Sequence, residues 1–519
     1  MADFRYLIFF FVCLLIGSCA QVGTISGGER DVSAPRPIDA EIVPKNESVH
    51  FAVKEVQIPF DEFFKLNDPT QNIVIVPPHA IIHARIKRKT LSMGWEEDLQ
   101  PNTTYAIFLN KAVRDISEGN DSVFQYVFST GSYLDSLSYA VSVVDAWTGK
   151  PAAKCLVGLY DIKTNEVRSF GETNSDGAVT LNYLPPGNYR INAFYDENGD
   201  LAVQAHEKVG FPLKPIVTID GRAEDSIPIR VSRPEPEAKI RTIQFSGPSS
   251  FLIGATRDIS DGEVFFNNKK IDSSHYKFIA ADSLQIFADV SELNLAEIIV
   301  SSRKIKDTVS VRFTDNRKNK AINLRCTNPY NQVSPSNNPT FELNDLVLSV
   351  DTSLIEITHL KDSSIIHDYT FSISHNELTF DIDKDTLEVA SFSFGENAVH
   401  CSSGSSTPLL SNLTFKRERN YGALLLNLEY YTDPILLYLE KGGNPVRVEY
   451  VPSPSSEYRI SEIPPGDYTF RVVRDTNNNR KWDVGNIAID MQPEIVDTYS
   501  KKTKIRANWE VSLSLIPTN

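Results

Sequence analysis

The chain consists almost throughout of short runs in which apolar and polar residues alternate, and this pattern restricts it to β-structure. Examples are AVKEVQIPF, YAVSVVDAW, SLQIFADV, DTVSVRFT, ALLLNLEYY and KIRANWEVSLSLI. Turn-forming clusters such as PKNES, NSDG, PPGN, KGGN and PPGD separate the runs at intervals of about ten residues. Because period-two alternation gives each strand one buried face, and long amphipathic helices are absent, the sequence predicts an all-β fold of tandem β-sandwiches.

The length of 519 residues predicts several domains, since domains usually span about 100 to 200 residues. We place the boundaries at the turn-rich and proline-rich joins between strand clusters. The predicted order is a signal peptide at 1–18, a flexible tether at 19–37, and β-rich modules at 38–132, 133–235, 236–325, 326–417 and 418–519.

The first residues carry the features of a secretory signal. Arg5 precedes the apolar run LIFFFVCLLI, which is too short to span a membrane, and Gly17 and Ser18 supply small residues before a cut. The sequence Ile16-Gly17-Ser18-Cys19 resembles the bacterial lipobox. That resemblance implies acylation of Cys19, cleavage before it and anchoring in a membrane, where each buried methylene contributes about 0.8 kcal/mol. The alternative is an ordinary signal peptide with a cysteine near the cut by chance.

The residues after Cys19 favour a location. Ala20 stands where an aspartate marks inner-membrane retention, so we expect the outer membrane, and AQVGTISG lacks an acidic run, which favours its periplasmic face. The formal charge of −15 is spread along the chain and argues against nucleic acid as a partner. After the signal only Cys155, Cys326 and Cys401 remain in the folded part. Cys155 is expected in a core, whereas Cys326 and Cys401 are either buried free thiols or a disulfide.

The chain also repeats itself. LPPGNYRINAFYDENGD from Leu184 aligns without gaps to IPPGDYTFRVVRDTNNN from Ile463, an offset of 279 residues. Each copy combines a Pro-Pro-Gly turn, a tyrosine, an alternating strand and an Asp/Asn-rich loop. Duplication is the simplest cause. The same offset pairs the first module with the segment around 326–411, which we expect to be a second copy of that module.

Several motifs resemble known families. IPFDEFFKLND, LQPNTTYAIFLNKAVRDISEGN and YVFSTG resemble the bacterial Ig-like domain first described in surface-layer proteins. The GKP turn, SDG turn and LPPGNY of 133–235 resemble the prealbumin-like or carboxypeptidase-regulatory sandwich. RDTNNNRKWDVGN, QPE and RANWE resemble the ending of Ig-like-domain lipoproteins of Bacteroidota, a family with no assigned biochemical activity. The resemblance implies Ig-like and prealbumin-like β-sandwiches in tandem, with 236–325 matching only as generic β.

The Asp/Asn-rich loops are candidate calcium sites. Oxygen side chains at positions 1, 3 and 5 of a loop, with another at 9 or 12, suit the hard cation Ca²⁺. The candidate ligands are Asp196, Asn198, Asp200 and Glu207 in the first copy and Asp475, Asn477, Asn479 and Asp483 in the second. The alternative is turn chemistry alone, because Asp and Asn tolerate left-handed backbone and bond their own backbone. Trp482 is expected to pack against a core or loop.

Other patterns give little chemistry. His79 and His83 would share a strand face, but no third zinc ligand is visible. GxSxG, Walker A, GxGxxG, CxxC and HExxH are absent from the sequence. We therefore expect a non-enzymatic, lipid-anchored envelope protein that acts as a structural, adhesive or protein-binding scaffold, shaped as a stiff rod of modules. The alternatives are a glycan-binding lipoprotein of an outer-membrane uptake complex and an envelope enzyme with an unrecognised carboxylate site.

Overall fold

Antiparallel strands dominate the computed structural model, which describes residues 32–117, 119–198, 202–204, 206–221, 228–288, 295–302, 306–312 and 320–518. The predicted signal peptide, Cys19 and Asp200 lie outside these residues. The described helices are all short: Asp39–Glu41 (η1), Pro69–Asn72 (α2), Ser273–His275 (η2), Pro329–Asn331 (η3), Thr352–Leu354 (η4), Glu418–Asn420 (η5) and Ile487–Ile489 (η6). The all-β fold class predicted from alternation is confirmed.

Five clusters of buried apolar side chains define five modules, which we number in chain order. The clusters extend over 42–128, 141–231, 251–311, 322–415 and 424–515. The predicted boundary at 326 falls on the last residue of a strand, Leu324–Cys326 (β24), and both Ile322 and Leu324 belong to the fourth core. The fourth module therefore begins before residue 326, because these two side chains are buried in its sandwich.

The first module packs two sheets face to face. One has the order β1-β5-β4, and in the other β6 pairs with β2, β3 and β7. Val56 and Ile58 of β1 are buried while Gln57 between them is exposed, as alternation requires. The strands are Glu55–Pro59 (β1), Phe64–Leu66 (β2), Ile73–Val76 (β3), His83–Lys87 (β4), Thr90–Gly94 (β5), Thr104–Asp115 (β6) and Asp121–Ser129 (β7).

The second and fifth modules have the same topology, which supports duplication. In each, the first strand pairs antiparallel with the fourth and parallel with the last, β8 with β15 and β35 with β41. The second strand pairs with the third and fifth in both. The strands of the second module are Leu137–Asp145 (β8), Leu156–Asp161 (β9), Val167–Glu172 (β10), Ala178–Leu184 (β11), Gly187–Phe194 (β12), Val209–Gly210 (β13), Ile216–Ile219 (β14) and Ile229–Val231 (β15). Those of the fifth are Gly422–Asn427 (β35), Ile435–Lys441 (β36), Asn444–Val451 (β37), Tyr458–Ile463 (β38), Gly466–Arg474 (β39), Val496–Ile505 (β40) and Glu510–Ser514 (β41).

The third and fourth modules share a strand order in one sheet. In both, the four strands of that sheet, counted along the chain, lie in the order first, second, fourth, third, as β16-β17-β21-β20 and β24-β26-β30-β29. The central segment, which matches only as generic β in sequence, thus has a defined sandwich topology. Its strands are Ile240–Phe245 (β16), Ser250–Ala255 (β17), Glu263–Phe266 (β18), Lys269–Lys270 (β19), Tyr276–Ala280 (β20), Ser283–Phe287 (β21), Leu295–Ser301 (β22) and Lys306–Arg312 (β23). After β24 the fourth module continues with Gln332–Val333 (β25), Thr340–Leu343 (β26), Val347–Val350 (β27), Ile355–His359 (β28), Tyr369–Ser374 (β29), Glu377–Ile382 (β30), Val389–Phe394 (β31), Val399–Cys401 (β32), Gly404–Ser405 (β33) and Leu409–Phe415 (β34).

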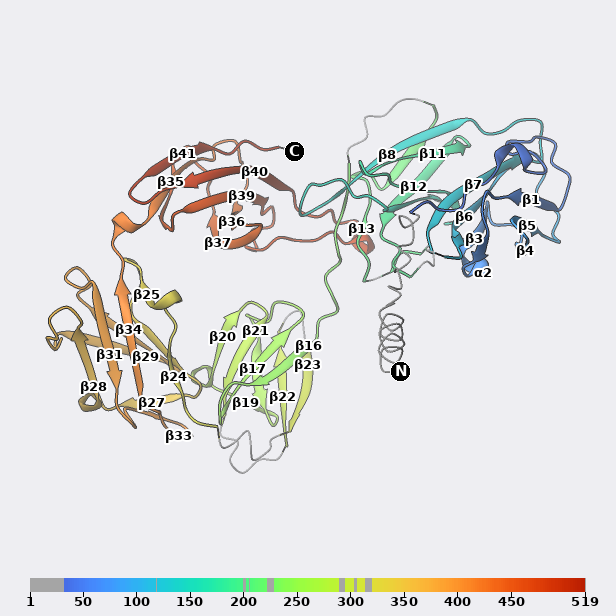
Figure 1. Ribbon diagram of the computed structural model, residues 1–519. Helices are drawn as coiled ribbons and strands as arrows, with labels where there is room; N and C mark the ends of the chain where they lie inside the picture. The colour runs from blue at the N-terminus through green and yellow to red at the C-terminus, as the bar shows by residue number, and fades with distance from the viewer. Residues whose placement is uncertain are drawn as a thin grey trace, which may run out of the picture.

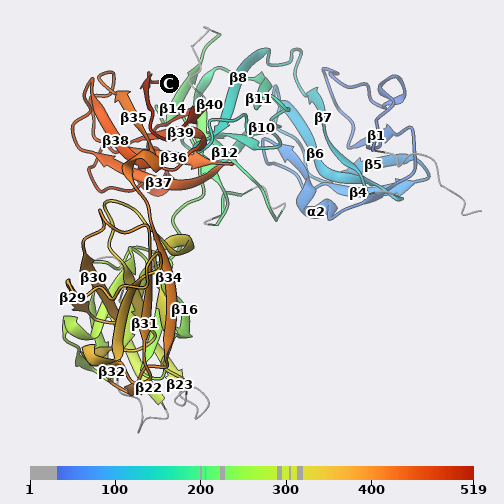
Figure 2. The ribbon, with the colours of Figure 1, turned by 60° about the vertical axis from the view of Figure 1, so that its left-hand side comes forward.

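The second to fifth modules close into a ring, from which the first module projects (Figures 1 and 2). Lys277 of the third module pairs with Glu377 of the fourth at 2.8 Å. The fifth module then turns back onto the second, where Arg471 lies over the Trp147 ring. The expected rod is therefore wrong, because the two duplicated modules bind each other instead of ending the chain apart.

Candidate functional site

The first Asp/Asn-rich loop follows β12 and is organised by a buried carboxylate. Glu207 is fully buried, and its two oxygens accept the backbone N–H of Glu197 at 2.8 Å and of Gln204 at 3.1 Å. Asp196 is half-buried and Asn198 exposed. Asp200 lies outside the described residues. In the described part of this loop, both oxygens of the Glu207 carboxylate thus accept hydrogen bonds from the loop backbone.

The second loop follows β39 and is closed by its own side chains. The carboxylate of the buried Asp475 accepts the backbone N–H of Asn479 at 3.0 Å and of Arg480 at 2.8 Å. Asp483 accepts the side-chain amides of Asn477 and Asn479 and pairs with Lys481 at 3.2 Å. Asn477 and Asn479 also accept the backbone N–H groups two residues on, those of Asn479 at 3.1 Å and Lys481 at 3.0 Å, which is the Asx-turn chemistry of the alternative prediction. No group of three or more His, Cys, Asp or Glu side chains is placed to hold a metal in the described residues, and calcium stays a prediction.

Hydrogen bonds reveal an equivalence that the sequence offset hides. Glu494 accepts the backbone N–H of Thr476 at 2.8 Å and of Asp483 at 3.2 Å. Thr476 and Asp483 align with Glu197 and Gln204, so Glu494 is the counterpart of Glu207. The spacing between these two glutamates exceeds the repeat offset by eight residues. Burial raises the pKa of Glu494, and the charge of Asp483 raises it further against the lowering effect of these hydrogen bonds.

The second loop also forms part of the contact between the duplicated modules, which we call the clasp. The clasp consists of Trp147, Ser232, Glu235, Arg471, Lys481, Trp482, Gly485 and Gln492. Its centre is Arg471, only 8 % exposed, which pairs with Glu440 at 3.0 Å and lies 4.6 Å from the Trp147 ring centroid. Arg471 also donates to the backbone carbonyl of Trp147. A buried arginine is thus paired, stacked and hydrogen-bonded, as a buried charge requires.

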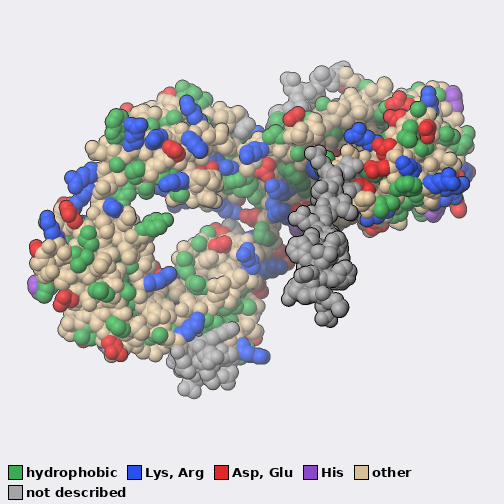
Figure 3. Space-filling model, viewed as in Figure 1, with side chains coloured by type: hydrophobic (Ala, Val, Ile, Leu, Met, Phe, Trp, Pro, Cys, Tyr) green, Lys and Arg blue, Asp and Glu red, His purple; other side chains and the backbone are tan. Residues whose placement is uncertain are grey.

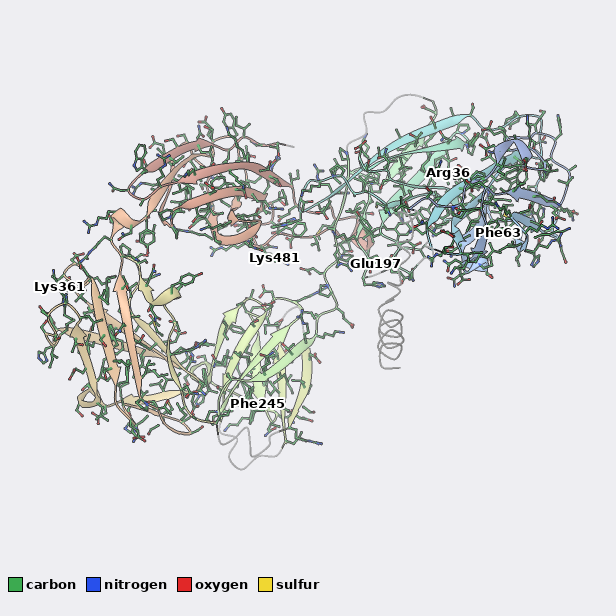
Figure 4. All side chains as sticks on the ribbon, viewed as in Figure 1. Arg36, Phe63, Glu197, Phe245, Lys361 and Lys481 are labelled. Carbon is green, nitrogen blue, oxygen red and sulfur yellow. The ribbon has the colours of Figure 1, made fainter. Side chains whose placement is uncertain are left out.

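The edge of the clasp adds bonds from the loop. Trp482 packs on Trp147 with ring centroids 4.8 Å apart, which confirms the expectation that it is a packing residue. Gly485 donates its backbone N–H to the Ser232 hydroxyl at 2.9 Å, and Gln492 donates to the carbonyls of Phe211 and Pro212 at 3.1 Å. Figure 4 labels Lys481 where the fifth module faces the second.

Lys481 joins the clasp to the linker after the second module. Its ammonium bonds Glu235 at 2.6 Å and Asp483 at 3.2 Å. Burial opposes its charge, but these hydrogen bonds outweigh burial and raise the pKa of Lys481. Beside it lies a cavity of about 450 Å³ lined by residues of three modules, among them Val203, Arg257 and Ile487. Residues of three modules therefore meet around this cavity.

The remaining predicted residues lie apart from the clasp. His83 is exposed in β4, while the ring nitrogen Nε2 of His79 lies 3.0 Å from the Asp98 carbonyl. Cys155, Cys326 and Cys401 are free. Burial raises the pKa of the Cys155 and Cys401 thiols to about 12, which makes them unreactive packing residues near neutral pH.

No helix among the described residues combines the length and hydrophobicity that crossing a bilayer requires.

Residues 33–130 match the model of the bacterial Ig-like domain family. This range covers most of the first module together with residues 33–37 of the predicted tether, and it confirms the resemblance drawn from the LQPNTTY turn and FSTG strand. A search of the curated proteins finds no match. The family match therefore describes the first module.

Several solved structures resemble the chain at low identity. One is the Bacteroides ovatus mixed-linkage glucan utilization locus protein SGBP-B, solved with a mixed-linkage heptasaccharide, with 10% identity, 79% of this chain and 99% of that chain covered, and a TM-score of 0.20. Another is BcpA, the major pilin subunit of Bacillus cereus, with 10% identity, coverage of 73% and 99%, and a TM-score of 0.14. The S-layer protein SbsC matches with 9% identity, coverage of 89% and 66%, and a TM-score of 0.16.

The sequence analysis did not predict the clasp, although the run FRVV of β39 holds two signals for it, an apolar run that does not alternate and an arginine within that run. Phe470, Arg471, Val472 and Val473 of β39 are all buried, so both faces of that strand are covered. An arginine in the middle of such a run indicates a partner for its charge. Glu494 belongs to the QPE motif singled out in the sequence, but its place opposite Glu207 emerges only from its hydrogen bonds.

Proposed function

We propose that this chain is a lipid-anchored, non-enzymatic scaffold of the cell envelope, held by Cys19 at the periplasmic face of the outer membrane. The observation that carries the scaffold is the clasp, which joins the two duplicated modules through a buried, paired arginine. A ring closed at every join holds its surfaces at fixed angles, as a spacer or assembly platform needs. Envelope proteins or glycans are its proposed partners.

The anchor rests on separate support. The lipobox-like Ile16-Gly17-Ser18-Cys19 supplies the thiol for acylation, and the tether that follows supplies distance from the bilayer. Several acyl chains hold a protein on a membrane far more firmly than one, since a single chain gives only reversible binding. The acidic chain gains no help from an anionic leaflet, so the lipid must supply the attachment.

Metabolic labelling with an alkyne-bearing fatty acid tests the anchor in a bacterium with two membranes. We expect label and membrane retention in the wild type and their loss in Cys19→Ser. Cys13→Ser, in the apolar run of the same signal, is the matched control and should keep both. Label that persists in Cys19→Ser, or that disappears in Cys13→Ser alone, contradicts the lipidation site.

A further inference from the structure

A cleft of about 990 Å³ lies where the fourth and fifth modules meet. Its size matches that of ligand pockets in general. The fourth module contributes η3, the loop after β25 and Lys416, and the fifth contributes Lys441, Glu462 and Tyr468. Figure 1 shows β25 at the end of the fourth module that faces the fifth. Figure 3 shows that side chains leave open the space enclosed by the third, fourth and fifth modules.

One wall presents an aromatic ring to solvent. Tyr330 is 94% exposed, and its backbone is left-handed, with φ 56° and ψ 24°. A bulky residue rarely adopts this conformation, which costs about 1–3 kcal/mol. The ring gains no burial in return. An exposed aromatic held by strained backbone at the mouth of a cleft is the arrangement expected of a ligand contact.

The opposite wall carries a second strained residue. Glu462 lies in β38 with φ 56°, and its carboxylate accepts the Ser336 hydroxyl at 2.6 Å across the cleft. This bond joins the fourth module to the fifth. Glu462 aligns with Tyr183 of the second module, which has φ 57°, so its left-handed backbone belongs to the repeated fold, whereas the bond to Ser336 lies at this opening.

The charge of the cleft is opposite to that of the chain. Lys416 and Lys441 line it, and the Lys441 ammonium lies 5.9 Å from the Tyr468 ring centroid. Within the part of the chain that the structure describes, neither lysine side chain makes a hydrogen bond or ion pair. Arg447 differs, because it pairs with Glu449. Although Glu462 also lines the cleft, the two lysines and Arg447 leave it with a net positive charge, which favours an anionic ligand in a protein of charge −15.

We propose that this cleft binds an oligosaccharide that carries carboxylate groups. The Tyr330 ring would stack on the apolar face of a sugar, Lys416 and Lys441 would pair with carboxylates, and Glu462 would accept a sugar hydroxyl. The other polar lining side chains are amides and hydroxyls: Gln332, Ser334, Asn337, Asn420 and Ser461. Such amides and hydroxyls can form hydrogen bonds with the many hydroxyl groups of a sugar, which favours an acidic oligosaccharide over an acidic peptide as the ligand. The binding goes beyond the scaffold function, which requires only the clasp and the anchor.

Calorimetric titration with tetragalacturonate tests the site on the purified chain from Ala20 to Asn519. We expect binding that weakens as salt rises. Tyr330→Gly, which keeps the left-handed backbone accessible, should lower the affinity about tenfold or more. Lys441→Gln should lower it as well. The matched controls are Tyr430→Ala, a tyrosine 52% exposed outside the cleft, and Lys501→Gln, an exposed lysine of β40. Melting temperatures that do not fall below that of the wild type confirm that the variants fold.

The outcomes separate the parts of the proposal. No heat with tetragalacturonate overturns it, and equal binding of the neutral cellotetraose overturns the acidic class. Equal binding of a glutamate-rich peptide overturns the carbohydrate assignment, and equal losses in Tyr330→Gly and Tyr430→Ala overturn the location. Lipid labelling of Cys19 does not depend on the cleft. Absence of oligosaccharide binding would therefore leave the proposed lipid anchor untouched.

Discussion

At the residue scale, Asp475 decides whether the second loop keeps its shape. Its carboxylate is fully buried and takes two backbone N–H groups. Asp475→Ala leaves both donors without this acceptor, which we expect to cost about 1–3 kcal/mol in the free energy of unfolding. Denaturant unfolding with a chelator present measures this. Asp467→Ala, at an exposed position near the start of β39, should change the free energy of unfolding by less than about 0.5 kcal/mol. Equal effects of the two variants would contradict the turn role.

The prediction that both Asp/Asn-rich loops bind calcium can be tested through the melting temperature. If Ca²⁺ binds there, it must raise the melting temperature of the wild type above the value in chelator, because a ligand of the folded state stabilises that state. The rise must shrink in a double Asp196→Ala, Asp475→Ala variant. A wild-type melting temperature that calcium leaves unchanged contradicts the metal site and leaves both loops as Asx turns.

At the element scale, the turns are where sequence predicted structure best. The SDG turn places Gly177 at φ +70°, and a Cβ there would lie 2.4 Å from the Val143 carbonyl oxygen. Gly149 of the GKP turn has a similar φ of +65° but open space around it. Gly149→Ala should therefore cost only the left-handed penalty of about 1–2 kcal/mol, whereas Gly177→Ala adds a steric clash. Denaturant unfolding should show the larger loss for Gly177→Ala, and equal losses would contradict the clash.

We expect the stability of the join between the third and fourth modules to depend on pH. Lys277 pairs with Glu342 at 3.5 Å and with Glu377 at 2.8 Å. Burial raises the pKa of Glu342, but the Arg325 hydrogen bond and the charges of Lys277 and Arg325 outweigh it and hold that pKa below its ordinary value of 4.5. A lowered pKa in the folded state means that Glu342 contributes stability above the ordinary value and loses it as pH falls through the lowered one.

Melting temperatures between pH 7 and 3 check this dependence. We expect Lys277→Met to melt below the wild type at pH 7, with a difference that narrows once the pH falls below 4.5. Lys501→Met, at an exposed lysine of β40, controls for the loss of one positive charge. A wild-type advantage that stays constant down to pH 3 would show that the ion pair does not stabilise the join.

Alternation and turns predict the β-elements because both act over a few neighbouring residues. Val56, Gln57 and Ile58 show their burial pattern in the sequence itself. Pairing between modules acts over hundreds of residues, and a single sequence does not show which distant residues meet. Trp147 and Arg471 lie 324 residues apart. The repeat offset likewise did not reveal that Glu494 is equivalent to Glu207, because Glu494 lies eight residues beyond the position that the offset predicts.

At the scale of the whole molecule, the clasp separates a ring from a rod, and Arg471 controls it. Arg471→Met removes the contacts to Trp147 and leaves Glu440, only 5% exposed, without its partner. Breaking one side of a buried pair costs about 3–5 kcal/mol. We therefore expect two effects, a lower melting temperature and an open ring with a larger radius of gyration in X-ray scattering.

A second substitution separates these effects. Glu440→Gln removes the stranded charge, so the double variant Arg471→Met, Glu440→Gln should regain much of the melting temperature while its ring stays open. Arg459→Met is the matched control, because Arg459 pairs with Glu510 at 2.7 Å on the exposed side of the same module and such pairs contribute little. A double variant as compact as the wild type would show that Arg471 stabilises the fifth module alone. Opening that persists without the buried charge would show that its contact with Trp147 holds the duplicated modules together.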